Sequence, residues 1–322
     1  RIALVVVLLQ SLVLAALPSE GQGKVYRLGW LAPTSSATGT PQLEALRKGL
    51  ADLGYVEGRN IAIEARWADG DATRLPRLAR ALVELKVDLI CSFGTPATLA
   101  AKKATKSIPI VFGQVAFPEQ SGILTSLARP GGNLTGIAFI GPEYGKRLEL
   151  LGEIFPKASR VVVLYNDQNI ASVLAMTETQ QWARKLQVTI DPLGVHDRAS
   201  LDGAFDTIRR GTPDAFMTTA DPVLQSYRTL IAEFAAERRL PSIPCDQEYV
   251  TAGGLMFYGT SMTDMWRHAA IYVDRIFKGA KPGDLPVEQP TNFDLVINMK
   301  TAKALGLTIP HTILLRATQV IE

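Results

Sequence analysis

The sequence predicts an α/β fold of two doubly wound parallel-sheet lobes joined by a hinge. Short apolar runs rich in Val and Ile alternate with stretches of helical spacing, and this alternation restarts near the middle of the chain. The length of 322 residues suits two domains of roughly 150 residues each. Continuous apolar strands separated by helices indicate parallel sheets that are covered on both faces.

The first half of the chain contains five expected strands. They are residues 26–31, 61–65, 87–92, 108–112 and 134–139. In the first helical stretch between them, Leu recurs every third or fourth residue from Leu43 to Leu53, and Gly54 follows as a helix stop. We therefore expect one βα unit after another, which forms lobe 1.

The second half repeats the pattern. We expect helices at 147–155, 173–186 and 223–238, with one further helix before 215, and strands at 161–165, 188–191, 215–219, 242–245 and 255–258. The amphipathic stretch 262–277 and the tail from Phe293 break this rhythm, so we expect them to cross between lobes. Lobe 1 is then 24–140 with part of about 260–290, and lobe 2 is 141–259 with part of about 291–322.

The N-terminus has the parts of a secretory signal peptide. Arg1 precedes the apolar residues 2–17, and the small and turn-forming residues 18–23 follow. The apolar run is shorter than the roughly 20 residues of a bilayer-spanning helix and is broken by Gln10 and Ser11. We expect residues 1–23 to direct export to the periplasm, with a membrane anchor or a core helix as alternatives.

Composition excludes several classes of protein. A hydrophobic content of 47% and a net charge of +3 exclude a disordered tail, and 2 Cys cannot make a disulfide-stapled miniprotein. No basic stripe indicates a nucleic-acid partner. Cys91 and Cys245 lie in separate apolar strands, so we expect two buried free thiols, with a disulfide between them as the alternative.

Ligands of open parallel sheets bind at the carboxyl ends of strands, so candidate binding residues can be taken from those ends. In the first half they are Ser35, Ser36, Gly94, Thr95, Pro96, Ala97 and Gln114. In the second half they are Asn166, Asp221, Asp246 and Tyr258. Small hydroxyl residues predominate at the strand ends of the first half and acids at those of the second half. This pattern suits a ligand with one anionic and one cationic end.

Three of these candidates have two interpretations. The helix start at Gly94–Thr95–Pro96 offers free N–H groups to a carboxylate or phosphate, or it is an ordinary helix cap. Asp221 either accepts an ammonium group or caps the helix that follows Pro222. Tyr258 either contacts the ligand or packs in the core.

Signals of catalysis are weak. The three His lie far apart in the chain, and none has metal-ligand spacing to another or stands beside a Cys. Nucleophile-elbow, phosphate-loop and dinucleotide-loop motifs do not occur. We expect no metal, no cofactor and no enzymatic activity. A two-domain enzyme that uses Asp167, Asp221 and Asp246 remains an alternative.

Several longer motifs, taken in order, carry a resemblance. They are residues 54–60 (GYVEGRN), 63–68 (IEARWA), 74–76 (RLP), 94–97 (GTPA), 108–112 (IPIVF), 128–136 (ARPGGNLTG) and 295–307 (LVINMKTAKALGL). This set resembles the ABC-transporter substrate-binding proteins of the tryptophan/tyrosine-binding type. The resemblance extends over residues 27–322.

The resemblance implies a type I periplasmic binding protein, with three crossovers between its lobes. Such a protein closes on a small solute and delivers it to an ABC permease in the inner membrane. In the family the ligand carboxylate lies near the helix start that matches 95–97, and the amine faces the acid that matches Asp221. Here Ala220 precedes that acid, a departure from the amino-acid binders that leaves organic acids open as ligands. We expect a monomer, with a sensor for a signalling partner as a further alternative.

Overall fold

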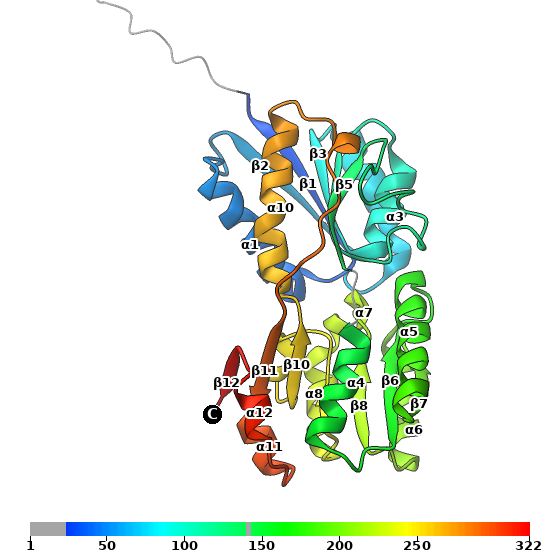
Figure 1. Ribbon diagram of the computed structural model, residues 1–322. Coiled ribbons are helices and arrows are strands. Elements are labelled where there is room, and N and C mark those ends of the chain that lie inside the picture. The colour runs from blue at the N-terminus through cyan, green and yellow to red at the C-terminus, as the bar shows by residue number, and fades with distance from the viewer. Residues whose placement is uncertain (1–23, 140–142) are drawn as a thin grey trace, which may run out of the picture.

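The computed structural model describes residues 24–139 and 143–322, which form two lobes arranged end to end (Figure 1). The expected signal segment 1–23 lies outside the described residues. Within the described part of the chain, no helix has the length and apolarity needed to cross a bilayer. The two doubly wound parallel-sheet lobes predicted from the sequence are confirmed.

Lobe 1 is built on a five-stranded parallel sheet of order β2-β1-β3-β4-β5. Its strands are β1 (Tyr26–Ala32), β2 (Ile61–Trp67), β3 (Leu89–Phe93), β4 (Ile110–Ala116) and β5 (Leu134–Phe139). The helices between them are α1 (Ser36–Asp52), α2 (Leu75–Glu84) and α3 (Gly94–Ala104), with a 3-10 turn η1 (Ala72–Arg74). Every residue of β3 is buried, as expected for a central parallel strand covered on both faces.

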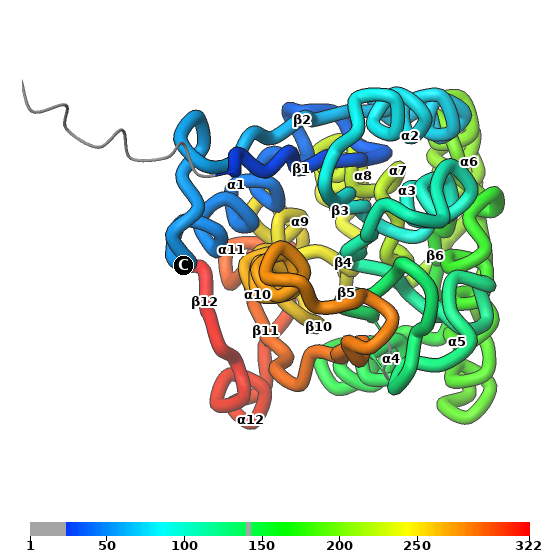
Figure 2. The backbone as a smooth tube through the Cα atoms, turned by 90° about the horizontal axis from the view of Figure 1, so that it is seen from above, coloured from blue at the N-terminus to red at the C-terminus, as the bar shows by residue number. Residues whose placement is uncertain are grey.

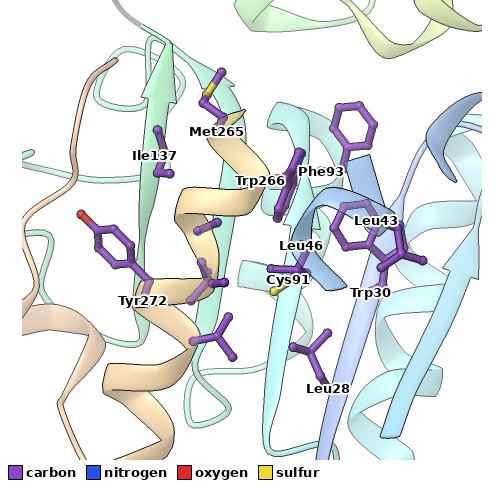
Figure 3. Packing of buried hydrophobic residues seen from close by; sticks show 14 of the residues in the cluster. Leu28, Trp30, Leu43, Leu46, Cys91, Phe93, Ile137, Met265, Trp266 and Tyr272 are labelled. Atoms are coloured by element: carbon purple, nitrogen blue, oxygen red, sulfur yellow. The ribbon is translucent and has the colours of Figure 1, made fainter. Parts of the chain in front are cut away.

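A helix from much later in the chain completes lobe 1. Helix α10 (Met262–Phe277) packs against α1, β4 and β5, as the view from above shows (Figure 2). Gly49 permits the close approach of α1, because a Cβ there would lie 2.4 Å from the carbonyl oxygen of Arg267. Trp266 of α10 packs on Trp30, with ring centroids 4.5 Å apart, in a fully buried apolar core (Figure 3).

Lobe 2 is built on a four-stranded parallel sheet of order β7-β6-β8-β9, beside a small sheet of order β10-β11-β12. The strands are β6 (Arg160–Tyr165), β7 (Thr189–Gly194), β8 (Ala215–Thr218), β9 (Ser242–Ile243), β10 (Met256–Gly259), β11 (Asp294–Asn298) and β12 (Gln319–Ile321). The helices are α4 (Glu143–Ile154), α5 (Ile170–Leu186), α6 (Arg198–Arg210), α7 (Pro222–Ser226), α8 (Arg228–Glu237), α9 (Glu248–Thr251), α11 (Met299–Ala304) and α12 (His311–Leu314), and η2 (Pro282–Asp284) is a 3-10 turn.

Two predictions for lobe 2 were wrong in detail. The helix expected at 223–238 is two helices, α7 and α8, because the backbone of Tyr227 (φ −100°, ψ 10°) leaves the helical region between them. The strand expected at 255–258 does not extend the parallel sheet. It is β10, which pairs antiparallel with β11. Apolar spacing continues across Tyr227 and does not encode strand direction, so neither feature is visible in the pattern.

The chain passes between the lobes three times. It crosses after β5, returns between β10 and α10, and crosses again through residues 285–293. A buried ion pair lies beside these crossovers: Arg147 binds Glu143 at 2.9 Å and donates from Nε to the carbonyl oxygen of Tyr258 at 2.7 Å. The hydroxyl of Thr260 donates to Glu143 at 3.4 Å. The start of α4 is thus tied to the second crossover at the edge of lobe 2.

The two lobes touch on the side of the strand ends. Ala171 of α5 belongs to the same buried apolar cluster as Phe93, Phe139 and Met262 of lobe 1. A Cβ on Gly94 would lie 3.2 Å from Cγ of Pro222 in lobe 2. The structure therefore has its lobes closed on each other.

Candidate ligand-binding site

A cavity lies between the facing strand ends of the two lobes. Its volume is about 30 Å³ in this closed arrangement, below the usual range of small-molecule sites, so the lobes must move apart to admit a ligand. Lobe 1 contributes Phe93, Gly94, Thr95, Gln114, Ala116, Phe139 and Met262. Lobe 2 contributes Asn169, Ala171, Ala220, Asp221, Pro222, Gln225, Cys245 and Asp246.

The start of α3 forms one wall. Strand β3 ends at Phe93, and the helix begins at once with Gly94. Gly94 has a φ of +75°, a backbone conformation that glycine adopts with little strain. Phe93, the N-cap, provides no side-chain acceptor for the first helical N–H groups. Those groups have no partner within a helix, and they carry the positive end of its dipole. This wall is suited to an anionic group.

Gln114 connects this wall to α10. A bulge in β4 places Gln114 in the left-handed region, at φ 58°. Its side-chain oxygen accepts from the indole N–H of Trp266 at 2.8 Å, and its amide contacts the sulfur of Met262 at 2.6 Å. Gln114 therefore fixes the N-terminal turn of α10, which brings Met262 to the cavity.

Asp221 lies on the opposite wall, at the end of β8 and before α7. Its Oδ1 accepts from the backbone N–H groups of Val223 (2.7 Å) and Leu224 (3.3 Å), as a helix cap does. The side-chain amides of Asn166 (3.2 Å, to Oδ1) and Asn169 (2.8 Å, to Oδ2) also donate to it. Asp221 is thus at the centre of a buried polar network and is 5% exposed.

Asp246 is a second buried carboxylate, three residues beyond the end of β9. Gln225 donates to its Oδ2 at 2.7 Å, and the backbone N–H of Glu248 donates to its Oδ1 at 3.0 Å. β8 and β9 are neighbouring parallel strands, so Asp221 and Asp246 share one edge of the sheet. Both acids line the cavity.

Burial dominates the electrostatics of this wall. It raises the pKa of Asp221, although the Asn169, Asn166 and backbone donors lower it. It also raises the pKa of Asp246, against the Glu248 N–H, Gln225 and nearby Arg side chains. Burial raises the pKa of the Cys245 thiol to about 11, so this side chain is a neutral, apolar part of the wall. Cys91 and Cys245 are both buried and unbonded, as expected.

The structure brings five of the predicted site residues together and places six elsewhere. Gly94, Thr95, Gln114, Asp221 and Asp246 line the cavity. The cavity lining does not include Ser35, Ser36, Pro96, Ala97, Asn166 and Tyr258.

Each of these six residues has a structural setting of its own. Ser35 and Ser36 stand at the start of α1, and Pro96 and Ala97 are in the first turn of α3. Asn166 lies behind Asp221, to which it donates. The ring of Tyr258 stacks on Phe293, with centroids 5.8 Å apart.

Other lining residues were missed from the sequence. Gln225 lies in α7, four residues after the N-cap Asp221, so helical spacing could have indicated it. Asn169 is the N-cap of α5, a position at which Asn is typical. Phe93 directly follows the predicted strand 87–92 and Phe139 ends the predicted strand 134–139, and both resemble ordinary core residues. Met262 reaches the cavity through the packing of α10, which no local signal encodes.

A second, more open crevice lies behind the hinge and is less suited to a ligand. It has a volume of about 450 Å³ and is lined mainly by the N-terminal part of α10 and by residues 288–294. Its His268 and Glu288 contact each other at 2.6 Å and are about half exposed. Its charged groups therefore have partners or face solvent, whereas those of the interlobe cavity are buried.

Comparisons with known proteins agree with this architecture. The family described as ABC transporter substrate binding protein matches residues 38–321. A tyrosine-binding protein from Clostridioides difficile (strain R20291) is 29% identical over 272 residues, 83% of this chain and 78% of that protein.

Two solved structures are similar to this chain, one with a ligand and one in a ligand-free, open form. An ABC domain from Streptococcus pneumoniae in complex with L-Trp is 26% identical, with a TM-score of 0.87, over 92% of this chain and 100% of that one. A ligand-free, open substrate-binding protein with adhesive properties from Clostridium difficile is 25% identical, with a TM-score of 0.67, over 92% and 99%.

The fold and the cavity define a two-lobed solute-binding protein of the type I periplasmic kind. The family match covers most of the chain, and the chain belongs to the ABC transporter substrate-binding protein family. Its role is to bind the substrate of an ABC transporter.

Proposed function

We propose that this protein captures an amino acid with an aromatic side chain between its lobes and hands it to an ABC permease. The observation that carries the proposal is the charge pattern of the cavity. One wall has the N-terminus of α3, and the other has the buried carboxylates Asp221 and Asp246. A zwitterion complements both walls, with its carboxylate at α3 and its ammonium group at the acids.

The same pattern disfavours simple organic acids. Among the described residues that line the cavity there is no Lys or Arg. A ligand with a carboxylate and no cation would add a third acid to a cavity whose described lining already holds two buried carboxylates and no Lys or Arg, which is unfavourable. The amino group is therefore part of the recognised structure.

The remaining walls are apolar and suit a ring. Phe93, Phe139 and Met262 face the cavity, together with three Ala side chains and the neutral thiol of Cys245. Aromatic and Met contacts favour a planar side chain. The relatives agree with this class, since one is named tyrosine-binding and another was solved with L-Trp.

Lobe closure couples binding to transport. Ligand contacts with both walls favour the closed arrangement by their difference in affinity between open and closed forms. The higher TM-score to the L-Trp complex than to the open, ligand-free protein supports a closed, binding-competent form. Export to the periplasm by residues 1–23, action as a monomer and the absence of enzymatic activity belong to the same proposal.

Calorimetry on the chain from Lys24 onward tests the ligand class. L-Trp, L-Tyr, L-Phe, L-Leu and des-amino acids form the panel, and we expect micromolar or tighter binding, about 8 kcal/mol, for an aromatic member. Mass spectrometry of the recovered ligand should show it unchanged. Binding of organic acids with no binding of amino acids would contradict the proposal, and a converted ligand would indicate an enzyme.

A further inference from the structure

The two carboxylates of the cavity differ in how many hydrogen bonds they already accept from the protein. Asp221 accepts four, from the N–H groups of Val223 and Leu224 and from the amides of Asn166 and Asn169. A carboxylate has about four acceptor positions. Three of these donors converge on Oδ1, which is saturated, whereas Oδ2 accepts from Asn169 alone and keeps about one position.

Asp246 accepts only two hydrogen bonds from the protein, one on each carboxylate oxygen. It accepts from Gln225 on Oδ2 and from the Glu248 N–H on Oδ1, so about two acceptor positions are left. The side chain is 4% exposed and lines the cavity, so bulk water has little access to it. A buried acceptor without a donor is costly, and a ligand that supplies the donor gains most at such a group.

The surroundings of each acid fit this division. Asp221 caps α7 and holds Asn169, which in turn caps α5 through the N–H of Ala171. Asp246 has its open acceptor positions beside Gln225, a second polar side chain of the cavity wall. Asp221 thus organises the wall, and Asp246 is available to a ligand.

From this count we infer that Asp246, not Asp221, accepts the ammonium group of the ligand and sets the preference for amino acids over their des-amino analogues. The inference rests on the proposed function. Asp221 is a positioning residue, which aligns Asn169 and the start of α7 with the cavity. This assignment differs from the one that the family resemblance implied for Asp221.

Two isosteric variants separate the roles. Asp246→Asn and Asp221→Asn each remove one charge from the same edge of the sheet. The ligands are L-Trp and L-Tyr, each paired with the propionic acid that lacks the amino group. Calorimetry gives the ratio of affinities within each pair, and thermal unfolding reports the integrity of the fold.

We expect the wild type to prefer the amino acid of each pair. Asp246→Asn should weaken amino acid binding by roughly 30-fold or more and remove most of that preference, because a buried charge pair is lost. Asp221→Asn should lower the unfolding temperature, because its new amide faces the amide of Asn169. Asp221→Asn should weaken the binding of both ligands of a pair by a similar factor, so the preference for the amino acid over its des-amino analogue is kept.

Each outcome bears on a different claim. If the wild type binds aromatic amino acids but Asp246→Asn keeps the preference, or Asp221→Asn removes it, the inference is wrong and the proposed function stands. If the wild type binds no amino acid, both are wrong. A crystal structure of the wild-type complex decides the matter even if a variant fails to fold. The amine nitrogen should lie within hydrogen-bond distance of an Asp246 oxygen, and contact with Asp221 alone would overturn the inference.

Discussion

Gly94 offers a test of lobe closure by a single methyl group. Alanine at its φ of +75° costs about 1–2 kcal/mol of folding free energy, whether the lobes are open or closed. In the closed form the new Cβ would also lie 3.2 Å from Cγ of Pro222, a rigid ring at the start of α7. Overpacking of this kind costs about 1–3 kcal/mol. That second cost arises only when the lobes meet.

Gly94→Ala should therefore weaken ligand affinity by roughly 5- to 150-fold, as measured by calorimetry with the aromatic amino acid that the wild type binds. Gly122→Ala is the matched control, because Gly122 has φ +73° and no atom within 4 Å of its ideal Cβ. Both variants should lose similar stability in urea, but the control should bind like the wild type. Equal affinities of the two variants would refute the contact between Gly94 and Pro222 in the bound form.

Three further predictions concern stability. Arg147→Met leaves Glu143 buried without its partner and should lower the unfolding free energy by about 3–5 kcal/mol in urea; a loss below 1 kcal/mol would argue against a structural ion pair. Gly113→Ala places a Cβ 2.6 Å from the ring of Trp266, so a loss of about 1–3 kcal/mol with altered tryptophan fluorescence is expected, and an unchanged melting curve would contradict this packing. Burial and the nearby carboxylate raise the pKa of Glu248 from 4.5 to about 7, so the folded chain keeps a proton that the unfolded chain loses. The free energy of unfolding should fall as the pH rises from about 4.5 to 7, and it should fall less in Glu248→Gln. If the urea midpoint changes by the same amount between pH 5 and pH 8 in the wild type and in Glu248→Gln, the raised pKa is contradicted.

Much of the fold could be predicted from the sequence, because parallel strands that are buried on both faces appear as continuous apolar runs. The strands and helices of lobe 1 appear near their predicted positions for this reason. Tyr227 is an exception. Its break between α7 and α8 is a matter of one residue's backbone angles, and the apolar spacing runs through it unchanged.

The candidate site was predictable where topology alone places it. Thr95, Asp221 and Asp246 follow strand ends, and parallel strands bring those ends to one edge of each sheet. Tyr258 was predicted at a strand end, but it lies within β10, which is antiparallel to β11, and its ring stacks on Phe293 outside the cavity lining. Met262 comes from a helix that joins the site across 148 residues of sequence, through its contact with Gln114. Such long-range packing has no local signature.

The central claim is that the cavity binds both ends of a zwitterion. Calorimetry with L-Trp, tryptamine and indole-3-propionate tests it most directly, because the last two compounds each lack one charged end. The claim predicts that L-Trp binds at least tenfold more tightly than either. Equal or tighter binding of tryptamine or indole-3-propionate would contradict it.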